Sequence, residues 1–285
     1  MNILKALFGS KVETPQEERK AEEARDFDVL KYDGVRALRT GQTAYATECF
    51  RRALDIKDDL EVRDYLSQAF IRQGALAEAF EQLQLMSEAE PENVAIYLRK
   101  ADVAYMMENY QAVAEACERA LVCDKDNAMA LYLYGKACMG MGDDVNAVAM
   151  FTKAMAMEEN FGDALLMRAK ANLRLGENEQ AKEDAEELLA KHPDNEDVLL
   201  LAADVEKAFG HTEEALLLYN KVTDVNPFSS VALMERAQLK RLLGDEAGAE
   251  DDLRAYKEIN PEADDENIAQ RVEDQNKIFD PFGIG

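Results

Sequence analysis

Residues 128–161, AMALYLYGKACMGMGDDVNAVAMFTKAMAMEENF, hold the pattern that decides the fold. Small residues stand at Gly135 and Ala147, and Gly142 lies between them. The pattern occurs seven times along the chain, at a spacing of 33 residues between the first two copies and 34 residues thereafter. A period of this length is typical of stacked two-element units that each contact only their neighbours. The sequence therefore predicts a repeat array and not a single globular core.

Two rows of small residues and one row of loop residues set the register of this array. The first small row is Gly34, Ser67, Ala101, Gly135, Ala169, Ala203 and Ala237. The second is Ala46, Ala79, Val113, Ala147, Ala181, Ala215 and Ala249. The loop row is Gly41, Gly74, Glu108, Gly142, Gly176, Gly210 and Gly244. Glycine adopts the left-handed conformation that ends many helices, so each copy is predicted to be a helix A, a tight turn and a helix B.

A further row has mostly larger side chains, which are predicted to fill the space between units. Its members are Phe50, Leu83, Cys117, Phe151, Ala185, Tyr219 and Leu253. Proline follows helix B at Pro91, Pro193, Pro227 and Pro261, and marks unit boundaries because it is tolerated only in the first turn of a helix. The seven units are expected at 27–59, 60–93, 94–127, 128–161, 162–195, 196–229 and 230–263.

The two ends differ from the repeats, as the ends of a solenoid must. Residues 1–26 are expected to form an N-terminal segment and a capping helix, which starts at a capping box formed by Thr14 and Glu17 and continues toward repeat one. Residues 264–285 are expected to form a C-terminal capping helix, about Glu266–Ile278, and an irregular tail.

These rows resemble the tetratricopeptide repeat family, whose unit has small residues at positions 8 and 20, an aromatic residue near 24, alanine at 27 and proline at 32. The sequence departs from the family pattern in having no tryptophan at position 4. The resemblance implies an all-α fold, a right-handed α-solenoid of seven helix-turn-helix repeats with helical caps. It also implies that the A helices line a concave groove.

Composition narrows the classes of function. The net charge of −25 argues against nucleic acid as a ligand, because phosphate binding needs a basic face. The four cysteines have no zinc or redox spacing, and Cys117 and Cys138 fall on positions that pack between helices. Reduced thiols suit a cytoplasmic protein, and the sequence has no apolar stretch long enough to span a membrane.

The sequence contains no constellation typical of an enzyme. His192 and His211 are its only histidines, and both are expected in loops between helices. Acidic pairs such as Asp143 and Asp144 are attributed to solvation and to helix dipoles. We therefore expect no enzymatic activity, no catalytic residue, no cofactor and no metal.

The family resemblance places helix A positions 5, 9, 12 and 13 in the groove. These positions hold eight basic and three acidic side chains in an otherwise acidic chain. Five of the basic residues lie near helix C-termini, where the helix dipole favours cations, and these are Arg39, Arg72, Arg174, Lys207 and Arg241. The three that remain are Lys31, Lys136 and Lys170.

Repeats three to five add apolar side chains at the same positions, and this region is the candidate peptide-binding groove. Its residues are Leu98, Tyr105, Met106, Tyr132, Lys136, Met139, Leu166, Lys170, Leu173 and Arg174. Tyrosine and methionine suit adaptable binding surfaces, and the cations suit carboxylates. The expected partner is a protein or peptide that bears acidic and apolar groups. The alternative is that several of the apolar residues belong to the core.

Two functions remain open at this stage. The first is a non-catalytic protein interaction scaffold. The second is a membrane-peripheral assembly factor or co-chaperone-like adaptor anchored through residues 1–9, where Ile3, Leu4, Leu7 and Phe8 form an apolar face. The two-carboxylate clamp for chaperone tails that the family resemblance brings is not expected, because position 9 holds no asparagine. The sequence does not predict the oligomeric state.

Overall fold

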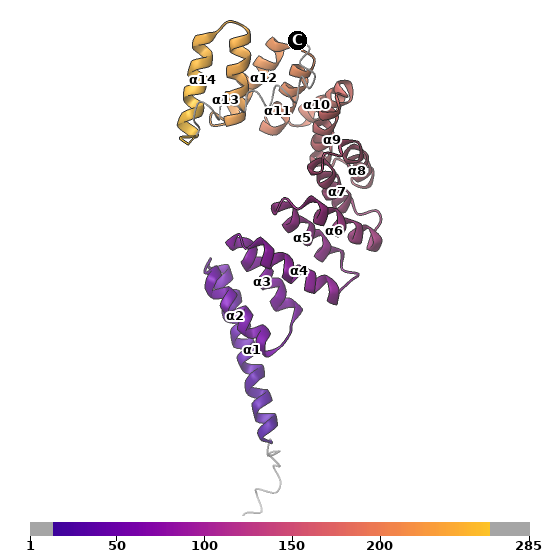
Figure 1. Cartoon of the computed structure of the whole chain (residues 1–285), viewed down its shortest axis with the longest axis vertical. Helices are drawn as coiled ribbons and strands as arrows, with labels where there is room; N and C mark the ends of the chain where they lie inside the picture. The colour runs from indigo at the N-terminus through magenta and orange to yellow at the C-terminus, as the bar shows by residue number, and fades with distance from the viewer. Residues whose placement is uncertain (1–13, 263–285) are drawn as a thin grey trace, which may run out of the picture. The chain divides into compact units, whose positions relative to one another are not determined.

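The computed structural model describes residues 14–262, and these residues form fourteen α-helices and no strand (Figure 1). Paired helices follow one another along the chain, joined by short turns. The helices are α1 (Pro15–Arg39), α2 (Thr43–Ile56), α3 (Leu60–Gln73), α4 (Leu76–Ala89), α5 (Val94–Met106), α6 (Tyr110–Cys123), α7 (Ala128–Gly140), α8 (Asp144–Met157), α9 (Gly162–Leu175), α10 (Asn178–Lys191), α11 (Glu196–Ala208), α12 (Thr212–Val225), α13 (Ser230–Leu242) and α14 (Glu246–Ile259). The all-α fold predicted from the repeat is confirmed.

The chain divides into two compact units. Unit 1 is Met1–Lys125 and holds α1 to α6, and unit 2 is Asp126–Gly285 and holds α7 to α14. The sequence pattern indicates one continuous array, whereas the division falls at the connection between repeats three and four.

Within each unit, every helix packs against the next one along the chain. The A helices also approach one another, since α3 contacts α1, and α9 contacts both α7 and α11. No two successive B helices among the described residues make a contact of comparable extent. The side chains of the A helices at positions 5, 9, 12 and 13 form what we call the A-helix face.

The two predicted rows of small residues lie where helices A and B of one repeat meet. All members of the row from Ala46 to Ala249 are buried. Every glycine of the loop row has a positive φ, for example 78° at Gly142, and Glu108 adopts the same left-handed conformation with a φ of 56°. The turn geometry inferred from glycine is confirmed, and at repeat three it is formed without glycine.

Two of the small residues must be glycine because of an aromatic ring in the same repeat. A Cβ atom on Gly34 would lie 2.5 Å from the Phe50 ring, and one on Gly135 would lie 2.6 Å from the Phe151 ring. Cβ atoms essentially never lie this close to a non-bonded atom, so a side chain would push the ring or the helix away. Repeats one and four therefore combine the smallest residue with a large buried ring.

Helix α1 begins at the predicted capping box, in which the Thr14 side chain accepts a hydrogen bond from the Glu17 backbone and the Glu17 carboxylate accepts one from the Thr14 backbone. It continues without a break into repeat one, and Phe27 is its first buried residue. The predicted anchor at residues 1–9 and the predicted C-terminal helix and tail at residues 264–285 lie outside the described residues. None of the described helices has the length and apolar character that crossing a membrane requires.

Candidate functional site

Three of the predicted groove residues belong to unit 1, and all three lie on α5. Leu98 and Tyr105 are half-buried, and Met106 is 53% exposed. The Tyr105 ring meets the Tyr110 ring edge-on at 5.8 Å, and burial raises the pKa of the Tyr105 hydroxyl. On this part of the A-helix face, the exposed side chain of Met106 is thus next in sequence to Tyr105, whose ring packs against Tyr110.

The other seven predicted residues belong to unit 2, where Tyr132 is the centre of an aromatic cluster. Its ring lies 5.9 Å from the Phe151 ring and 5.1 Å from the Phe161 ring. The Lys136 ammonium lies 5.6 Å from the centre of the same ring, within the range of a cation–π contact. Both Tyr132 and Lys136 are half-buried. The tyrosine therefore has a structural contact as well as a surface that faces solvent.

Several apolar groove residues also contribute to the core, in agreement with the alternative interpretation of the sequence. Met139 is only 9% exposed. Leu166 and Leu173 are partly buried and pack against the core cluster that contains Leu165 and Leu201. The apolar surface left for a ligand is therefore narrower than the sequence pattern indicates.

Arg174 has partners inside unit 2, which the sequence does not reveal. Its Nη1 donates to the Met139 carbonyl oxygen at 3.2 Å, and its Nε lies 3.2 Å from Oδ2 of Asp144. Asp144 lies in the first turn of α8, as predicted, but its side chain is only 11% exposed, so the predicted solvation of this residue is wrong. Burial raises the pKa of the Asp144 carboxyl, Arg174 lowers it, and Asp143 raises it further.

Lys170, by contrast, lies half-buried on the A-helix face near a second group of charges. Asp204 accepts a hydrogen bond from the Tyr219 hydroxyl at 2.7 Å. Burial raises the pKa of the Asp204 carboxyl, while Tyr219, Lys207 and Lys170 act in the opposite direction and Glu235 raises it. Buried Glu235 forms an ion pair with Lys207. The A-helix face of repeats five and six thus holds Lys170, Asp204 and Lys207, and Glu235 of repeat seven lies beside it.

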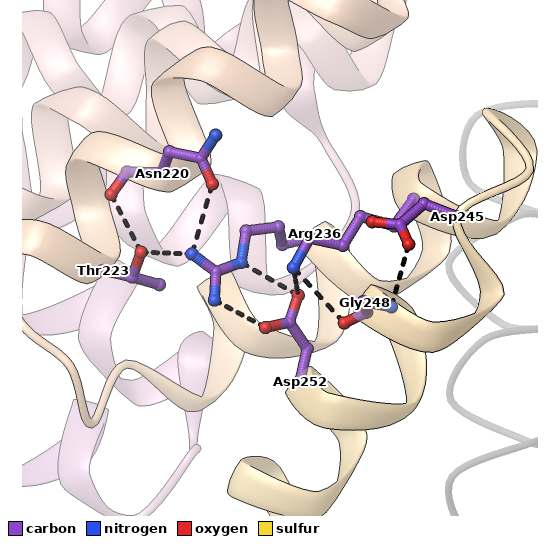
Figure 2. A network of polar contacts seen from close by, with 7 residues as sticks. Asn220, Thr223, Arg236, Asp245, Gly248 and Asp252 are labelled. Atoms are coloured by element: carbon purple, nitrogen blue, oxygen red, sulfur yellow. Dashed lines mark hydrogen bonds and ion pairs between the residues drawn. The ribbon is translucent and has the colours of Figure 1, made fainter.

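A set of ion pairs that the sequence analysis missed joins helices A and B. Figure 2 shows the largest, in which Arg236 Nε and Nη2 donate to the two carboxylate oxygens of Asp252 at 2.9 and 2.5 Å. Arg236 Nη1 also reaches Asn220 and Thr223 on α12 of the preceding repeat. Arg168 and Asp184 form the equivalent pair in repeat five. The signal in the sequence is an arginine followed sixteen residues later by an aspartate.

The remaining candidates for chemistry lie apart from one another. His192 and His211 stand next to helix ends, as predicted, and His211 Nδ1 lies 2.7 Å from Glu206. Cys117 and Cys138 are buried between helices, which confirms their predicted packing role. Across residues 14–262, no three His, Cys, Asp or Glu side chains converge on a point that would hold a metal ion.

Comparison with known proteins agrees with this architecture. Residues 173–239 match the sequence model of the tetratricopeptide repeat. No curated protein matches the chain significantly. The similar solved structures include a tetratricopeptide repeat protein from Parabacteroides merdae ATCC 43184, with a TM-score of 0.74 and 17% identity over 87% of this chain and 98% of that one.

Two further solved structures share the fold over most of their own length. PilW, a widely conserved type IV pilus biogenesis factor, has a TM-score of 0.65 and 17% identity over 75% of this chain and 97% of its own. YrrB, a TPR protein with an unusual peptide-binding site, has a TM-score of 0.50 and 18% identity over 67% of this chain and 97% of its own. Together with the repeat register and the helix pairs, these comparisons show that residues 173–239 contain tetratricopeptide repeat sequence and that the chain has the fold of tetratricopeptide repeat proteins.

Proposed function

We propose that this protein is a non-catalytic scaffold that binds an extended segment of a partner protein along the A-helix face of unit 2. One observation carries the proposal. Lys136 and Lys170 occupy the same position on α7 and α9, two helices in contact, in a protein whose net charge is −25. Lysines beside partly exposed apolar groups suit a segment that bears acidic and apolar side chains.

The two kinds of group contribute differently to such binding. The lysines orient the segment and raise the rate of association, while apolar contacts with Tyr132 and Leu166 supply most of the affinity. Arg174 is expected to contribute less, because a ligand would compete with its contacts to Asp144 and the Met139 carbonyl. YrrB, which shares the fold and has a peptide-binding site of its own, is a precedent that supports the proposal.

The test is affinity capture from a lysate of the source organism, followed by mass spectrometry. Partners of the wild-type chain are compared with those of the double variant Lys136→Glu/Lys170→Glu and those of the matched control Lys20→Glu/Arg25→Glu. The control makes the same change of charge on the exposed start of α1. We expect partners to be lost from the first variant only, and salt to reproduce part of the loss. Equal recovery by both variants would refute the proposal.

A further inference from the structure

Unit 1 has an open cavity on its A-helix face that the sequence pattern does not reveal. Its volume is about 640 Å³, and it lies between α1 and α3. Its lining consists of Lys31, Tyr32, Val35, Arg36, Arg39, Thr40, Glu61 and Tyr65. Three of these residues are cationic and one is anionic, so the cavity is locally positive in a strongly acidic chain.

Two of the three cations are already paired within unit 1. Lys31 forms an ion pair with Glu61, which is the main reason that the pKa of the Lys31 ammonium is raised. Arg36 lies 2.9 Å from Asp33, although its side chain remains 75% exposed. The third cation, Arg39, is exposed and makes no ion pair or side-chain hydrogen bond within residues 14–262. The positive character of the cavity therefore depends chiefly on Arg39.

The same position in other repeats explains why Arg39 is unoccupied. Arg72 and Arg174 stand at position 13 of repeats two and five. Each donates to the carbonyl oxygen of the residue at position 12 in the preceding repeat, Arg72 to Leu38 at 2.7 Å and Arg174 to Met139 at 3.2 Å. Arg39 belongs to the first repeat of the described residues 14–262, and these residues include no earlier helix A whose carbonyl it could reach. Its guanidinium keeps its full capacity for two parallel hydrogen bonds to a carboxylate.

The cavity also offers apolar surface next to this guanidinium. Tyr32 lines the cavity and is 73% exposed, so its ring is accessible to a ligand. The Tyr65 ring is held in place by stacking on Phe50 at 5.7 Å, and its hydroxyl donates to Glu61. One ring is thus fixed and one is open to solvent, with Val35 also lining the cavity.

We propose that this cavity is a second binding site, which takes an acidic side chain from an extended segment of a partner protein, with its carboxylate on Arg39 and an adjacent apolar side chain between Tyr32 and Tyr65. Charge complementarity selects the acidic group. The exposed ring selects its apolar neighbour. The site lies wholly within unit 1, so it does not depend on the proposed face of unit 2.

The experiment selects ligands from a random dodecapeptide library displayed on phage, with the full-length protein as bait. The enriched peptides are then synthesised with a fluorescent label and titrated against variants by anisotropy. Arg39→Glu tests the guanidinium, and Arg25→Glu is its matched control on the exposed part of the same helix. Tyr32→Ala tests the open ring, and Phe228→Ala is its control, since Phe228 is 74% exposed but belongs to unit 2.

We expect enriched peptides that carry Asp or Glu beside an apolar residue. Arg39→Glu should weaken their binding by about tenfold and Tyr32→Ala by about fivefold, while each control changes it by less than about twofold. Enriched peptides that still bind Lys136→Glu/Lys170→Glu are assigned to this site and are the ones titrated against the Arg39 and Tyr32 variants, whereas peptides that this double variant loses are assigned to the unit 2 face.

Three results would overturn the inference. One is a selection that yields no acidic consensus, and another is a consensus that binds Arg39→Glu as tightly as the wild type. The third is Arg39-dependent sedimentation with phosphatidylserine vesicles in the absence of any peptide ligand, which would make the cavity a lipid-headgroup site.

Discussion

Repeats four and seven hold their two helices together by different means at neighbouring positions. In repeat four, the Phe151 ring of α8 lies directly against Gly135 of α7. In repeat seven, the equivalent residues are Leu253 and Ala237, and the adjacent positions carry the Arg236–Asp252 ion pair instead. Helices A and B are thus held together in repeat four by an aromatic ring packed against a glycine, and in repeat seven by a largely buried ion pair.

The difference shows that the repeat requires contact between helices A and B but not one particular kind of contact. The unit needs close contact between helices A and B, and a large ring against glycine provides it by buried area alone. A smaller side chain such as Leu253 buries less apolar area. In repeat seven the bidentate ion pair adds directional hydrogen bonds between the two helices, and Arg236 also contacts Asn220 and Thr223 in the preceding repeat. Such a pair depends on both of its members, because one partner left alone is an uncompensated buried charge.

The largest effect is therefore expected from breaking the ion pair. Asp252→Ala leaves Arg236 and Lys240 without their shared carboxylate and should cost about 3 kcal/mol of unfolding free energy. Exposed Asp251→Ala on the same helix is the control and should change stability by less than about 0.5 kcal/mol. Urea denaturation measures both, and similar midpoints for the two variants would contradict a role for the pair.

The ring-to-backbone contact should be more tolerant, and it allows a direct conversion between the two repeats. Gly135→Ala should destabilise by about 1–2 kcal/mol, as overpacking outweighs the gain in helix propensity. Adding Phe151→Leu reproduces the alanine–leucine pair of repeat seven, and the double variant should cost less than the sum of the single changes.

Gly162→Ala is the control for that cycle, because a Cβ there would lie 3.9 Å from its nearest neighbour, a Leu188 methyl, at an ordinary contact distance. Its effect on the urea midpoint should be slight. Strict additivity of Gly135→Ala and Phe151→Leu would show that volume matching is not what links these two positions.

Repeat six has a ring with a polar contact of its own, since its buried Tyr219 ring occupies the aromatic position and donates a hydrogen bond to Asp204. Tyr219→Phe keeps the ring and removes the donor, so we expect a loss of about 1 kcal/mol. Thermal or urea unfolding would measure it, with Tyr32→Phe as an exposed control. An unchanged midpoint would mean that the ring alone closes this repeat.

The smallest expected effect is a dependence on pH. Burial raises the pKa of Asp204 above its ordinary 3.8, so the folded state holds a proton that the unfolded state has lost. The unfolded chain then binds fewer protons, and stability contributed by this residue falls as pH rises from 3.8 through the folded pKa. Asp204→Asn removes the contribution, so urea titrations at a series of pH values should show the stability of this variant relative to wild type rising across that window and then levelling off.

The sequence was sufficient for the repeat architecture because each of its signals is local or strictly periodic. Gly142 reports a left-handed turn and Ala147 a close helix contact, whatever lies elsewhere in the chain. Thr14 and Glu17 likewise indicate a helix start within four residues. Such features depend on backbone sterics and on the period, and both are visible in one dimension.

The candidate site was less predictable because side-chain partners lie one repeat or one helix away. Arg174 has the charge and the repeat position expected of a ligand-binding residue, but its contacts to Met139 and Asp144 connect repeats four and five. The helix dipole accounts for Arg39 in the sequence, and only comparison with Arg72 in three dimensions shows that its guanidinium is unoccupied. Neither distinction follows from the types of residue.

The first half of the long helix α1 extends from repeat one as an arm. Its exposed part from Pro15 to Asp26 extends about 18 Å beyond the first packed residue, at about 1.5 Å per residue. The capping box and the Arg19–Glu23 pair stiffen this arm, and the packed turns that follow anchor it. A tilt of about ten degrees in repeat one would therefore swing the start of α1 by about 3 Å, so a small change of packing in repeat one is amplified at the far end of this arm.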